Sequence, residues 1–413
     1  MTAETFVIVG ANLAGGAAVS TLRQEGFDGR LVMIGAEPHL PYERPPLSKQ
    51  YLRGEQTENA YLRQADWYEE NQVELMLSTR AERVDPKERV VRLEGGESVP
   101  FDKALIATGG RNRRLTQPGA ELPGIHQLRT VEEADAIRAE AAPGRRAVIV
   151  GAGFIGSEVG ASLRQLGVDV DVIDHGRLPL LRVLGPEIGQ IYADLHREYG
   201  VRFHSEQGCD RFEGDGRVEA VVTTAGTRIE CDFVVAGVGI EPATEVVEGT
   251  DVEVENGILV DQWCRTNAPG VFAAGDVANH SHPLFGRRLR VEHWDNALKQ
   301  GAAAARNMMG KDLPFDDPHW FWSDQFEYNL QYLGHAIAWD ELVVRGSLEG
   351  RSFVAFYLKD GLVEAVVGLD RGRDVRRSTG LIRARRPVDP AVLRDEDLDL
   401  KALGATLAGR GAR

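Results

Sequence analysis

The chain has 413 residues, enough for two or three domains that each bury their own hydrophobic core. Hydrophobic residues make up 43% and charged residues 27% of the sequence, which is typical of a globular protein in water. The formal net charge of −15 argues against general nucleic-acid binding, which needs a dominant basic surface. No apolar run approaches the roughly 18 residues that a membrane-spanning helix needs.

The cysteines predict neither a disulfide framework nor a metal site. Cys209, Cys231 and Cys264 form no CxxC pair and lack the spacing of metal ligands, so buried thiols in the reducing cytoplasm are expected. The segment from Met1 to Gly16 has no basic start, and Asn12 and several glycines interrupt its apolar stretch. It predicts the first strand of a fold and not a signal peptide.

The N-terminal segment predicts a strand–turn–helix–strand unit. Thr5–Val9 is a β-branched apolar run of the kind found in buried parallel strands. The glycine-rich stretch 10–16 follows it, then a helical pattern through Leu22 and a second strand over Arg30–Ile34. This order within about 30 residues is that of a complete βαβ unit.

The first glycine turn departs from the GxGxxG pattern at its second glycine, which is Asn12. The Cβ of Asn12 should crowd a pyrophosphate, although asparagine tolerates a left-handed backbone better than most residues. Gly10 and Gly15 are kept, and Glu37 follows Gly15 by 22 residues at the end of the second strand. The pattern favours a dinucleotide site, with a purely structural turn as the alternative.

The same order returns in the middle of the chain. Ala147–Val150 is the predicted strand, 151–156 the turn, Ser157–Leu166 the helix and Val168–Ile173 the next strand. Two copies of the unit predict two nucleotide sites, or one site and a decayed duplicate.

The second turn carries the full fingerprint. Gly151 permits the tight turn, Gly153 lets the backbone approach a pyrophosphate, and Gly156 lets the helix pack closely. Asp174 ends the next strand, 18 residues after Gly156, where its carboxylate can accept hydrogen bonds from both ribose hydroxyls and repel a 2′-phosphate. The pattern favours NADH over NADPH, although Arg177 lies close enough to blur the choice.

Further strands are expected between and after the two units. They are Val84–Leu93, Lys103–Ala107, a meander over Glu219–Val238, Val271–Ala274, Leu342–Gly346, Ser352–Leu358 and Val363–Gly368. Gly275 and Asp276 follow one of them, where a carboxylate can bond the ribityl hydroxyls of a flavin. The sequence pattern changes at the aromatic cluster 319–322, which is followed by alternating strand-like stretches. This change predicts a separate C-terminal α/β domain from about Pro318.

These motifs together resemble a known family, the NADH-dependent ferredoxin reductases of oxygenase and P450 systems. The resemblance runs from residue 5 to about residue 400. It is carried by Gly10–Gly15, Pro41–Lys49, Ala107–Gly109, Gly151–Glu158, Gly237–Pro242, Gly275–Asp276, Glu292–Trp294 and Trp320–Asp324. The strings Arg-Pro-Pro-Leu-Ser-Lys and Trp-Phe-Trp-Ser-Asp are the most specific of these.

The resemblance implies a glutathione-reductase-like α/β fold with two Rossmann-like domains, in which the NAD domain interrupts the FAD domain. The expected domains are 1–112 and 245–317 for FAD, 113–244 for NAD, 318–403 for the C-terminal domain and 404–413 for a flexible tail.

The resemblance also implies the cofactor contacts. The FAD set is Gly10, Asn12, Leu13, Ala14, Gly15, Glu37, Arg44, Pro45, Lys49, Ala81, Ala107, Thr108, Gly109, Arg111, Gly275, Asp276, Glu292, His293, Trp294 and Trp322. The NAD set is Gly151, Gly153, Phe154, Ile155, Gly156, Glu158, Asp174, Gly237, Val238 and Gly239.

Within these sets, the family pattern places Lys49 near flavin N5 and pairs it with Glu158. An ammonium fixed there would stabilise the anionic reduced flavin, so Lys49 and Glu158 are the predicted catalytic residues. Arg111 would meet the FAD phosphates, with Glu37 and Ala81 at the adenosine end, and two tryptophans would flank the isoalloxazine. An ordinary surface lysine and simple tryptophan core packing are the alternatives.

The absence of a cysteine near the expected flavin distinguishes this chain from two other classes of enzyme with the same fold. Disulfide reductases and NADH peroxidases keep a redox cysteine near the flavin, yet no cysteine lies between Glu37 and Gly109. Leu13 stands where peroxidases carry a histidine. Peroxide and disulfide chemistry are therefore not expected. The resemblance implies instead electron transfer from NADH through FAD to a [2Fe-2S] ferredoxin. The alternatives are an NADH oxidase or quinone diaphorase without a protein acceptor, and a redox-sensing protein like apoptosis-inducing factor.

A local basic surface is needed to attract an acidic ferredoxin to this acidic chain. Two arginine clusters supply candidates for docking. They are Arg371, Arg373, Arg376 and Arg377 with Arg383, Arg385 and Arg386, and separately Arg287, Arg288 and Arg290. A solvated face without a partner is the alternative for each cluster.

Overall fold

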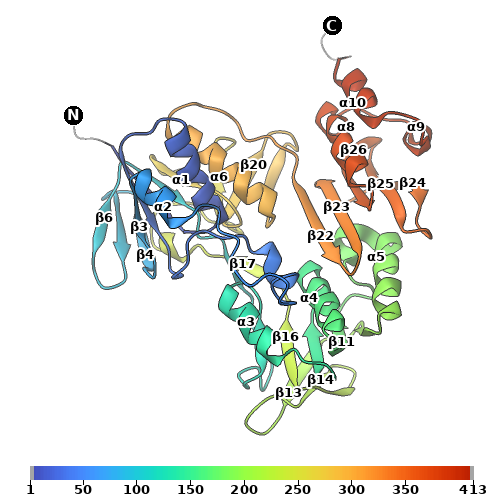
Figure 1. Cartoon of the computed structure of the whole chain (residues 1–413). Helices are drawn as coiled ribbons and strands as arrows, with labels where there is room; N and C mark the ends of the chain where they lie inside the picture. Colours follow the sequence, from blue (N-terminus) through green and yellow to red (C-terminus); the bar gives the residue numbers. More distant parts are fainter. Residues whose placement is uncertain (1–3, 410–413) are drawn as a thin grey trace. The chain divides into compact units, whose positions relative to one another are not determined.

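The computed structural model describes residues 4–409, and its contacts divide the chain into two compact units (Figure 1). The first unit holds the chain up to Glu43, Asn59–Arg111 and Ile240–His319, and the second holds Arg44–Glu58, Asn112–Gly239 and the chain from Trp320 onward. Each unit is therefore built from three separate stretches. The finer division into FAD, NAD and C-terminal domains stays a prediction.

The first unit is centred on a five-stranded parallel sheet of order β19-β7-β1-β2-β3. Its strands are Val271–Ala273 (β19), Lys103–Ile106 (β7), Thr5–Val9 (β1), Arg30–Ile34 (β2) and Val73–Met76 (β3). Strand β1, which precedes the first glycine turn, lies in the middle of the sheet. On one side of β1 the sheet continues through β2 and β3, and on the other side through β7 and β19. That is the topological switch point, where open parallel sheets bind ligands at their carboxyl edge.

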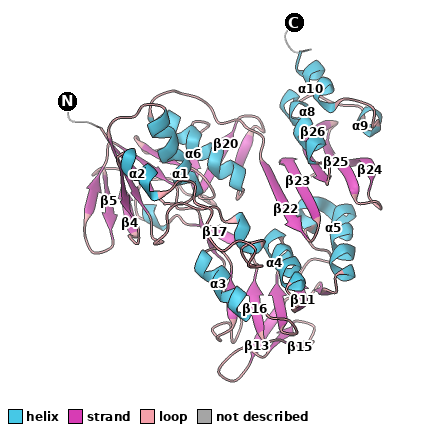
Figure 2. Ribbon diagram, viewed as in Figure 1, coloured by secondary structure: helices cyan, strands magenta, loops and turns pink. Residues whose placement is uncertain are grey.

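Apolar side chains cover both faces of this sheet. On one face, Ile8 and Leu105 pack against helices α1 (Leu13–Gln24) and α6 (Trp294–Met308), which lie side by side in Figure 2. On the other face, Val9 and Ile106 pack against Val84 of a small antiparallel sheet. A strand buried on both faces needs the near-continuous β-branched run seen in the sequence.

The remaining elements of the first unit are short. They are α2 (Ala65–Glu70), the antiparallel strands β4 (Ala81–Asp85), β5 (Val90–Leu93) and β6 (Ser98–Pro100), the strands β18 (Ile258–Val260), β20 (Ala278–His282) and β21 (Arg287–Arg290), and the 3-10 turn η2 (Glu245–Val247). The strands β8 (Gly110–Asn112) and β17 (Ile240–Pro242) pair with each other where the chain passes between the units.

The single strand expected over Val84–Leu93 is corrected to a hairpin of β4 and β5. Asp85 ends β4, and its Oδ1 accepts hydrogen bonds from the main-chain amides of Lys87 and Glu88, each at 3.1 Å. Such an aspartate turn, with a proline inside it, reverses the chain more readily than it extends a strand.

The second unit repeats the parallel sheet, with order β12-β11-β10-β16-β9. Its strands are Arg202–Ser205 (β12), Asp169–Asp174 (β11), Arg146–Val150 (β10), Phe233–Ala236 (β16) and Ile125–Gln127 (β9), and its helices are α3 (Val131–Glu140), α4 (Phe154–Gln165) and α5 (Leu181–Glu198). A small antiparallel sheet joins β13 (Cys209–Glu213), β14 (Ala220–Thr223) and β15 (Arg228–Glu230). The helix after the glycine turn begins at Phe154, three residues earlier than expected.

The C-terminal part of this unit is a five-stranded antiparallel sheet of order β22-β23-β26-β25-β24, followed by four helices among the described residues. Its strands are Trp320–Gln325 (β22), Tyr328–Gly334 (β23), Glu341–Ser347 (β24), Ser352–Lys359 (β25) and Leu362–Leu369 (β26), and its helices are α7 (Gly372–Arg377), α8 (Thr379–Ala384), α9 (Pro390–Arg394) and α10 (Leu400–Gly409). Helix α5 packs on this sheet, where Leu184 and Tyr192 join the core of Phe353 and Tyr357.

The flexible tail expected from residue 404 stays a prediction, and within it α10 continues to Gly409. Gly404 is buried, and a Cβ built there would lie 2.9 Å from main-chain atoms of Gly380 in α8. The two glycines allow the helices to approach closely, which stabilises a segment that looks frayed in the sequence. Residues 410–413 of the predicted tail, like residues 1–3, lie outside the described part of the chain.

Candidate functional site

The first glycine turn is fixed by a close approach of main chain to main chain. Gly10 follows β1 with φ +120°, and a Cβ there would lie 2.2 Å from the carbonyl oxygen of Ala107, the residue after β7. A Cβ on Gly15 would lie 2.0 Å from the carbonyl oxygen of Gly10. Only glycine fits either position, and the turn starts helix α1 with its free amide groups at the carboxyl edge of the sheet.

The second glycine turn has nearly the same geometry. Gly151 has φ +105°, and a Cβ there would lie 2.5 Å from the carbonyl oxygen of Gly237, the residue after β16. A Cβ on Gly156 would lie 2.0 Å from the carbonyl oxygen of Gly151. The two turns are therefore structural duplicates, each closed by the residue that follows a neighbouring strand.

The start of helix α4 leaves open space at Gly153. Gly153 is the N-cap residue of α4, and a Cβ built there would meet no atom within 4 Å. Packing within the protein does not require a glycine at this position, unlike Gly151 and Gly156. The open space adjoins the helix N-terminus, whose amide groups and partial positive charge suit the pyrophosphate of a dinucleotide.

Asn12 stands at the corresponding N-cap position of α1. Its backbone is extended, with φ −112° and ψ −165°, close to the φ −75° and ψ −176° of Gly153. The left-handed conformation considered for Asn12 from the sequence is thus corrected, because any L-residue adopts this backbone. The side chain of Asn12 does not cap the helix.

Asp174 holds the edge of the second turn in place. Its Oδ2 accepts a hydrogen bond from the amide of Ala152 at 2.6 Å, and its Oδ1 accepts one from the amide of Gly176 at 2.6 Å. An ionised carboxylate has about four acceptor positions, so two oxygens already bound once can each accept another donor. The predicted bond to ribose hydroxyls is compatible with this arrangement.

The other residues predicted for FAD in the first unit gather at the carboxyl ends of its strands. Glu37 follows β2, and its Oε2 accepts a hydrogen bond from Tyr42 Oη at 2.7 Å. Thr108 follows β7 and donates its hydroxyl to the carbonyl oxygen of Ala243 at 2.6 Å. Arg111, expected at the FAD phosphates, forms ion pairs with Glu241 and Glu245.

A second group of predicted residues surrounds the start of helix α6. The amide of Gly275 donates to Gln300 Oε1 at 2.8 Å, and Asp276 is the next residue. His293 is the N-cap of α6, Trp294 is its first residue, and Glu292 pairs with Arg290 at 2.7 Å. The structure therefore brings three sequence motifs of the first unit to one edge of its sheet, the edge that open parallel sheets use for ligands.

The second unit contains a buried ion pair between Lys49 and Glu158. The Nζ atom of Lys49 lies 2.6 Å from Glu158 Oε2, and the two residues are 5% and 3% exposed. Lys49 also donates to the carbonyl oxygen of Pro45 at 3.2 Å. Removing one partner from such a pair leaves an uncompensated buried charge, which typically costs about 3–5 kcal/mol. The pair is therefore held firmly.

Two further hydroxyl groups donate to the same carboxylate. Ser48 Oγ lies 2.5 Å from Glu158 Oε2, and Ser323 Oγ lies 2.7 Å from Glu158 Oε1. Both serines stand inside the motifs that carry the family resemblance, but their role as partners of Glu158 was not predicted. No local pattern joins positions separated by 110 and 165 residues.

The remaining predicted residues of this unit flank the ion pair along the chain. Arg44 precedes Pro45 and donates to the carbonyl oxygen of Arg129. Trp322 is half-buried on β22, stacks on Trp320 with ring centroids 5.3 Å apart, and donates to Asp324 Oδ2 at 3.1 Å. Trp294 belongs to the first unit, so each tryptophan is placed only within its own unit.

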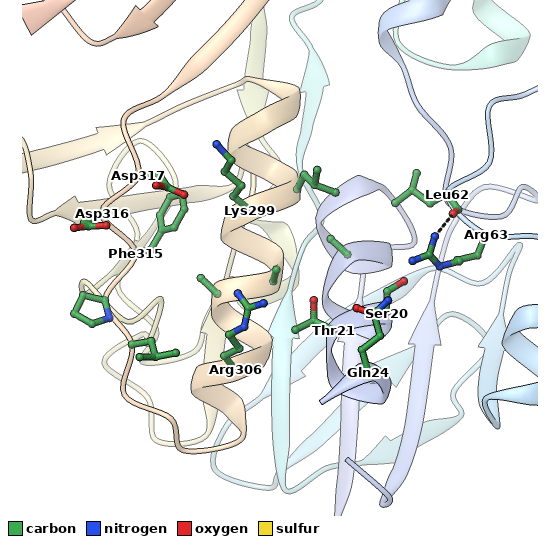
Figure 3. A pocket seen from close by; sticks show the side chains of 16 residues that line it. Ser20, Thr21, Gln24, Leu62, Arg63, Lys299, Arg306, Phe315, Asp316 and Asp317 are labelled. Atoms are coloured by element: carbon green, nitrogen blue, oxygen red, sulfur yellow. Dashed lines mark hydrogen bonds between the residues drawn. The ribbon is translucent and has the colours of Figure 1, made fainter. Parts of the chain in front are cut away.

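A separate cavity of about 570 Å³ lies between helices α1 and α6 (Figure 3). Ser20 and Thr21 of α1 and Lys299 and Arg306 of α6 line it, together with a segment around Phe315. None of the residues predicted for FAD or NAD lines this cavity. It has cationic and anionic side chains on its wall, so its charge indicates no particular ligand.

The cysteines take no part in either group of residues. All three are buried free thiols, and burial raises the pKa of Cys209 to about 11 and that of Cys231 to about 12. A thiol becomes a nucleophile only as the thiolate, so these groups are unreactive at neutral pH. Within residues 4–409 there is no cluster of three side chains suited to a metal ion, and no helix is long and apolar enough to cross a membrane.

Comparison with known proteins decides the family. A family model described as pyridine nucleotide-disulphide oxidoreductase matches residues 4–301, and a reductase C-terminal model matches residues 320–404. The chain belongs to the pyridine nucleotide-disulphide oxidoreductase family. The members of this family that resemble the chain include reductases of oxygenase systems.

Two curated members and one solved structure illustrate this. The anthranilate 1,2-dioxygenase system ferredoxin–NAD(+) reductase component of Burkholderia cepacia is 40% identical over 97% of this chain and 99% of its own length. Putidaredoxin reductase of Pseudomonas putida is 35% identical over 97% and 96% of the two chains. The crystal structure of the covalent putidaredoxin reductase–putidaredoxin complex matches with a TM-score of 0.95 and 33% identity, covering 100% of both chains. The predicted resemblance to ferredoxin reductases and the predicted fold class are confirmed.

We predict that Asp174→Ala lowers the preference for NADH over NADPH by about tenfold, because the ribose hydroxyls lose an acceptor and a 2′-phosphate loses a repelling charge. Both cofactors should also bind more weakly, since Asp174 holds two main-chain amides. The measurement is therefore the ratio of kcat/KM for NADH to kcat/KM for NADPH. Asp169→Ala, at the opposite end of the same strand, should keep the wild-type ratio, and an unchanged ratio in Asp174→Ala would contradict the specificity assignment.

A reciprocal exchange tests the two N-cap positions. Asn12→Gly should bind FAD as tightly as the wild type or more tightly, because it removes a side chain beside the expected pyrophosphate while the backbone stays extended. Gly153→Asn should fold, since its Cβ meets no protein atom, but should weaken NADH binding. Fluorescence titration with each cofactor measures both effects. Loss of flavin from Asn12→Gly would show that Asn12 itself contacts FAD.

Proposed function

We propose that the protein is an NADH:ferredoxin oxidoreductase that binds FAD at the first glycine turn and NADH at the second. The observation that carries the proposal is the pair of duplicated glycine turns, together with a buried Lys49–Glu158 pair and three buried free cysteines. The names of its relatives support it, since they include ferredoxin–NAD(+) reductase components of dioxygenase systems and putidaredoxin reductase.

The cofactors supply the redox chemistry in this proposal. When bound, FAD accepts hydride from NADH at N5 and releases the two electrons one at a time to a [2Fe-2S] ferredoxin that serves an oxygenase or a P450. The protein contributes binding, orientation and electrostatics. The sets of FAD and NAD contacts predicted from the sequence stand as proposals on this basis, as does the division into FAD, NAD and C-terminal domains.

Lys49 has the clearest proposed role. Its ammonium contacts Glu158 at 2.6 Å and the carbonyl oxygen of Pro45 at 3.2 Å, so the protein holds the ammonium in one position. A positive charge fixed in a low-dielectric region stabilises a negative charge nearby much more strongly than one in water. We assign it to the negative charge of the reduced flavin, with Glu158 as its counter-ion.

The arginines of helix α7 are the better candidates for ferredoxin docking. Arg373 and Arg376 are exposed, and Arg376 donates only to the neutral side chain of Gln331 among the contacts described for it. Arg371 is already paired with Asp374 and Glu396. In the second cluster, Arg288 donates to two main-chain carbonyls at 3.0 Å. Arg288 therefore already has a structural role and is a weaker candidate for docking.

We also keep the cytoplasm as the proposed location. The support for it is the state of the cysteines, all three of which are free and buried, as expected for a protein in a reducing compartment.

Anaerobic stopped-flow spectroscopy tests the proposed function. We expect NADH to reduce the bound flavin rapidly, air to reoxidise it slowly, and turnover to become fast only when a ferredoxin is added. Rapid oxygen consumption without ferredoxin would indicate an NADH oxidase instead. A long-lived charge-transfer complex with a changed oligomeric state would indicate a redox-sensing protein.

Charge reversal tests the docking surface. The double variant Arg373→Glu/Arg376→Glu should raise the KM for ferredoxin by about tenfold and flatten its salt dependence, because steering depends on the local positive charge. Reduction of the flavin by NADH should stay at the wild-type rate. Arg89→Glu/Arg92→Glu changes the net charge equally on the β4–β5 hairpin and serves as the control. Equal ferredoxin kinetics in the two double variants would remove α7 from the docking surface.

A further inference from the structure

Glu158 is the end of a longer series of buried hydrogen bonds within the second unit. Gln325 Nε2 lies 3.1 Å from Ser323 Oγ, and His196 Nε2 lies 2.7 Å from Gln325 Oε1. Ser323, Gln325 and His196 are all 0% exposed. Together with Glu158 and Lys49 they form a continuous polar series, called here the Glu158 series, that crosses four separate chain segments.

The donors in this series all point toward Glu158. The amide oxygen of Gln325 can only accept, so His196 Nε2 must carry the proton in their bond. The amide nitrogen of Gln325 can only donate, so it occupies an acceptor position on Ser323 Oγ. The hydroxyl proton of Ser323 is then free to point at Glu158 Oε1, 2.7 Å away. Each bond therefore sets the direction of the next one.

The far end of the series is closed. Burial lowers the pKa of His196 to about 4, so its imidazole is neutral at physiological pH. Its Nδ1 atom is buried without a hydrogen-bond partner among residues 4–409. Phe203 and Phe326 contact the ring with edge-on geometry. A path for protons would need an exit to solvent, so this arrangement holds groups in place and does not conduct protons.

We propose that Ser323 is a positioning residue for the redox site, which holds the Glu158 carboxylate in the orientation that fixes Lys49, with Gln325 and His196 setting the direction of the Ser323 hydroxyl. This inference rests on the proposed function of Lys49 beside the flavin. Ser48 and Lys49 both bind Oε2, whereas Ser323 is the only described donor to Oε1. Without Ser323, the carboxylate can rotate about its last bond and take the ammonium with it.

The experiment uses the FAD-loaded full chain with the single change Ser323→Ala. The limiting rate of flavin reduction by NADH should fall about tenfold, because a displaced ammonium stabilises the transferred charge less well. The dissociation constant for NADH should change less than the reduction rate, since Ser323 is not itself a proposed NADH contact and Glu158, which is one, remains in the chain. The midpoint potential of the bound flavin, measured by spectroelectrochemistry, should become more negative.

Three variants separate positioning from general destabilisation. Ser157→Ala removes another buried hydroxyl, one that has no partner among the described residues, and should keep the wild-type rate and potential. Ser323→Thr keeps the hydroxyl and should restore most of the rate. In a Glu158→Gln background, Ser323→Ala should cause little further loss, because a residue that acts through Glu158 has no independent effect.

The outcomes distinguish this inference from the proposed function. A wild-type protein that does not bind FAD or oxidise NADH would overturn both. A functional wild type in which Ser323→Ala matches Ser157→Ala in rate and potential would overturn the positioning role alone. An additive loss in the Glu158→Gln background would do the same, because Ser323 would then act by another route.

Discussion

At each glycine turn, the main chain runs so close to the residue after a neighbouring strand that no side chain fits between them. A Cβ at Gly10 or Gly151 would approach a carbonyl oxygen to within 2.2 or 2.5 Å. The following helix can begin only where this contact places it, with its free amide groups at the carboxyl edge of the sheet. The free amide groups proposed to bind the cofactor phosphates are placed by this local constraint.

The Lys49–Glu158 pair adds an electrostatic element to this frame. Burying two charges is costly, and their mutual attraction offsets the loss of solvent only when further hydrogen bonds satisfy the remaining positions. Ser48 and Ser323 provide such bonds on the two oxygens of Glu158. The same low dielectric that makes the pair costly also makes its ammonium effective on nearby charge.

Much of this arrangement is readable from the sequence because it depends on neighbours along the chain. The two βαβ units, their glycines and Asp174 follow from short patterns whose steric basis is local. The expected strand over Val84–Leu93 was wrong because a turn aspartate outweighed the apolar pattern around it. The helix over residues 404–409 was not predicted, because the contact of Gly404 with Gly380 joins helices that are separate in sequence.

The sequence by itself determined the fold class, the two nucleotide-binding turns and the absence of a redox cysteine near the first of them, because glycine sterics and residue chemistry act over a few positions. Only the tertiary structure decided which groups other than Lys49 surround Glu158, and which arginines of the docking candidates are already engaged. Ser323 reaches that carboxylate from 165 residues away, and Arg288 donates to the carbonyl oxygen of Val260 in a neighbouring segment. Contacts of this kind depend on how strands and helices pack, and no spacing along the chain encodes them.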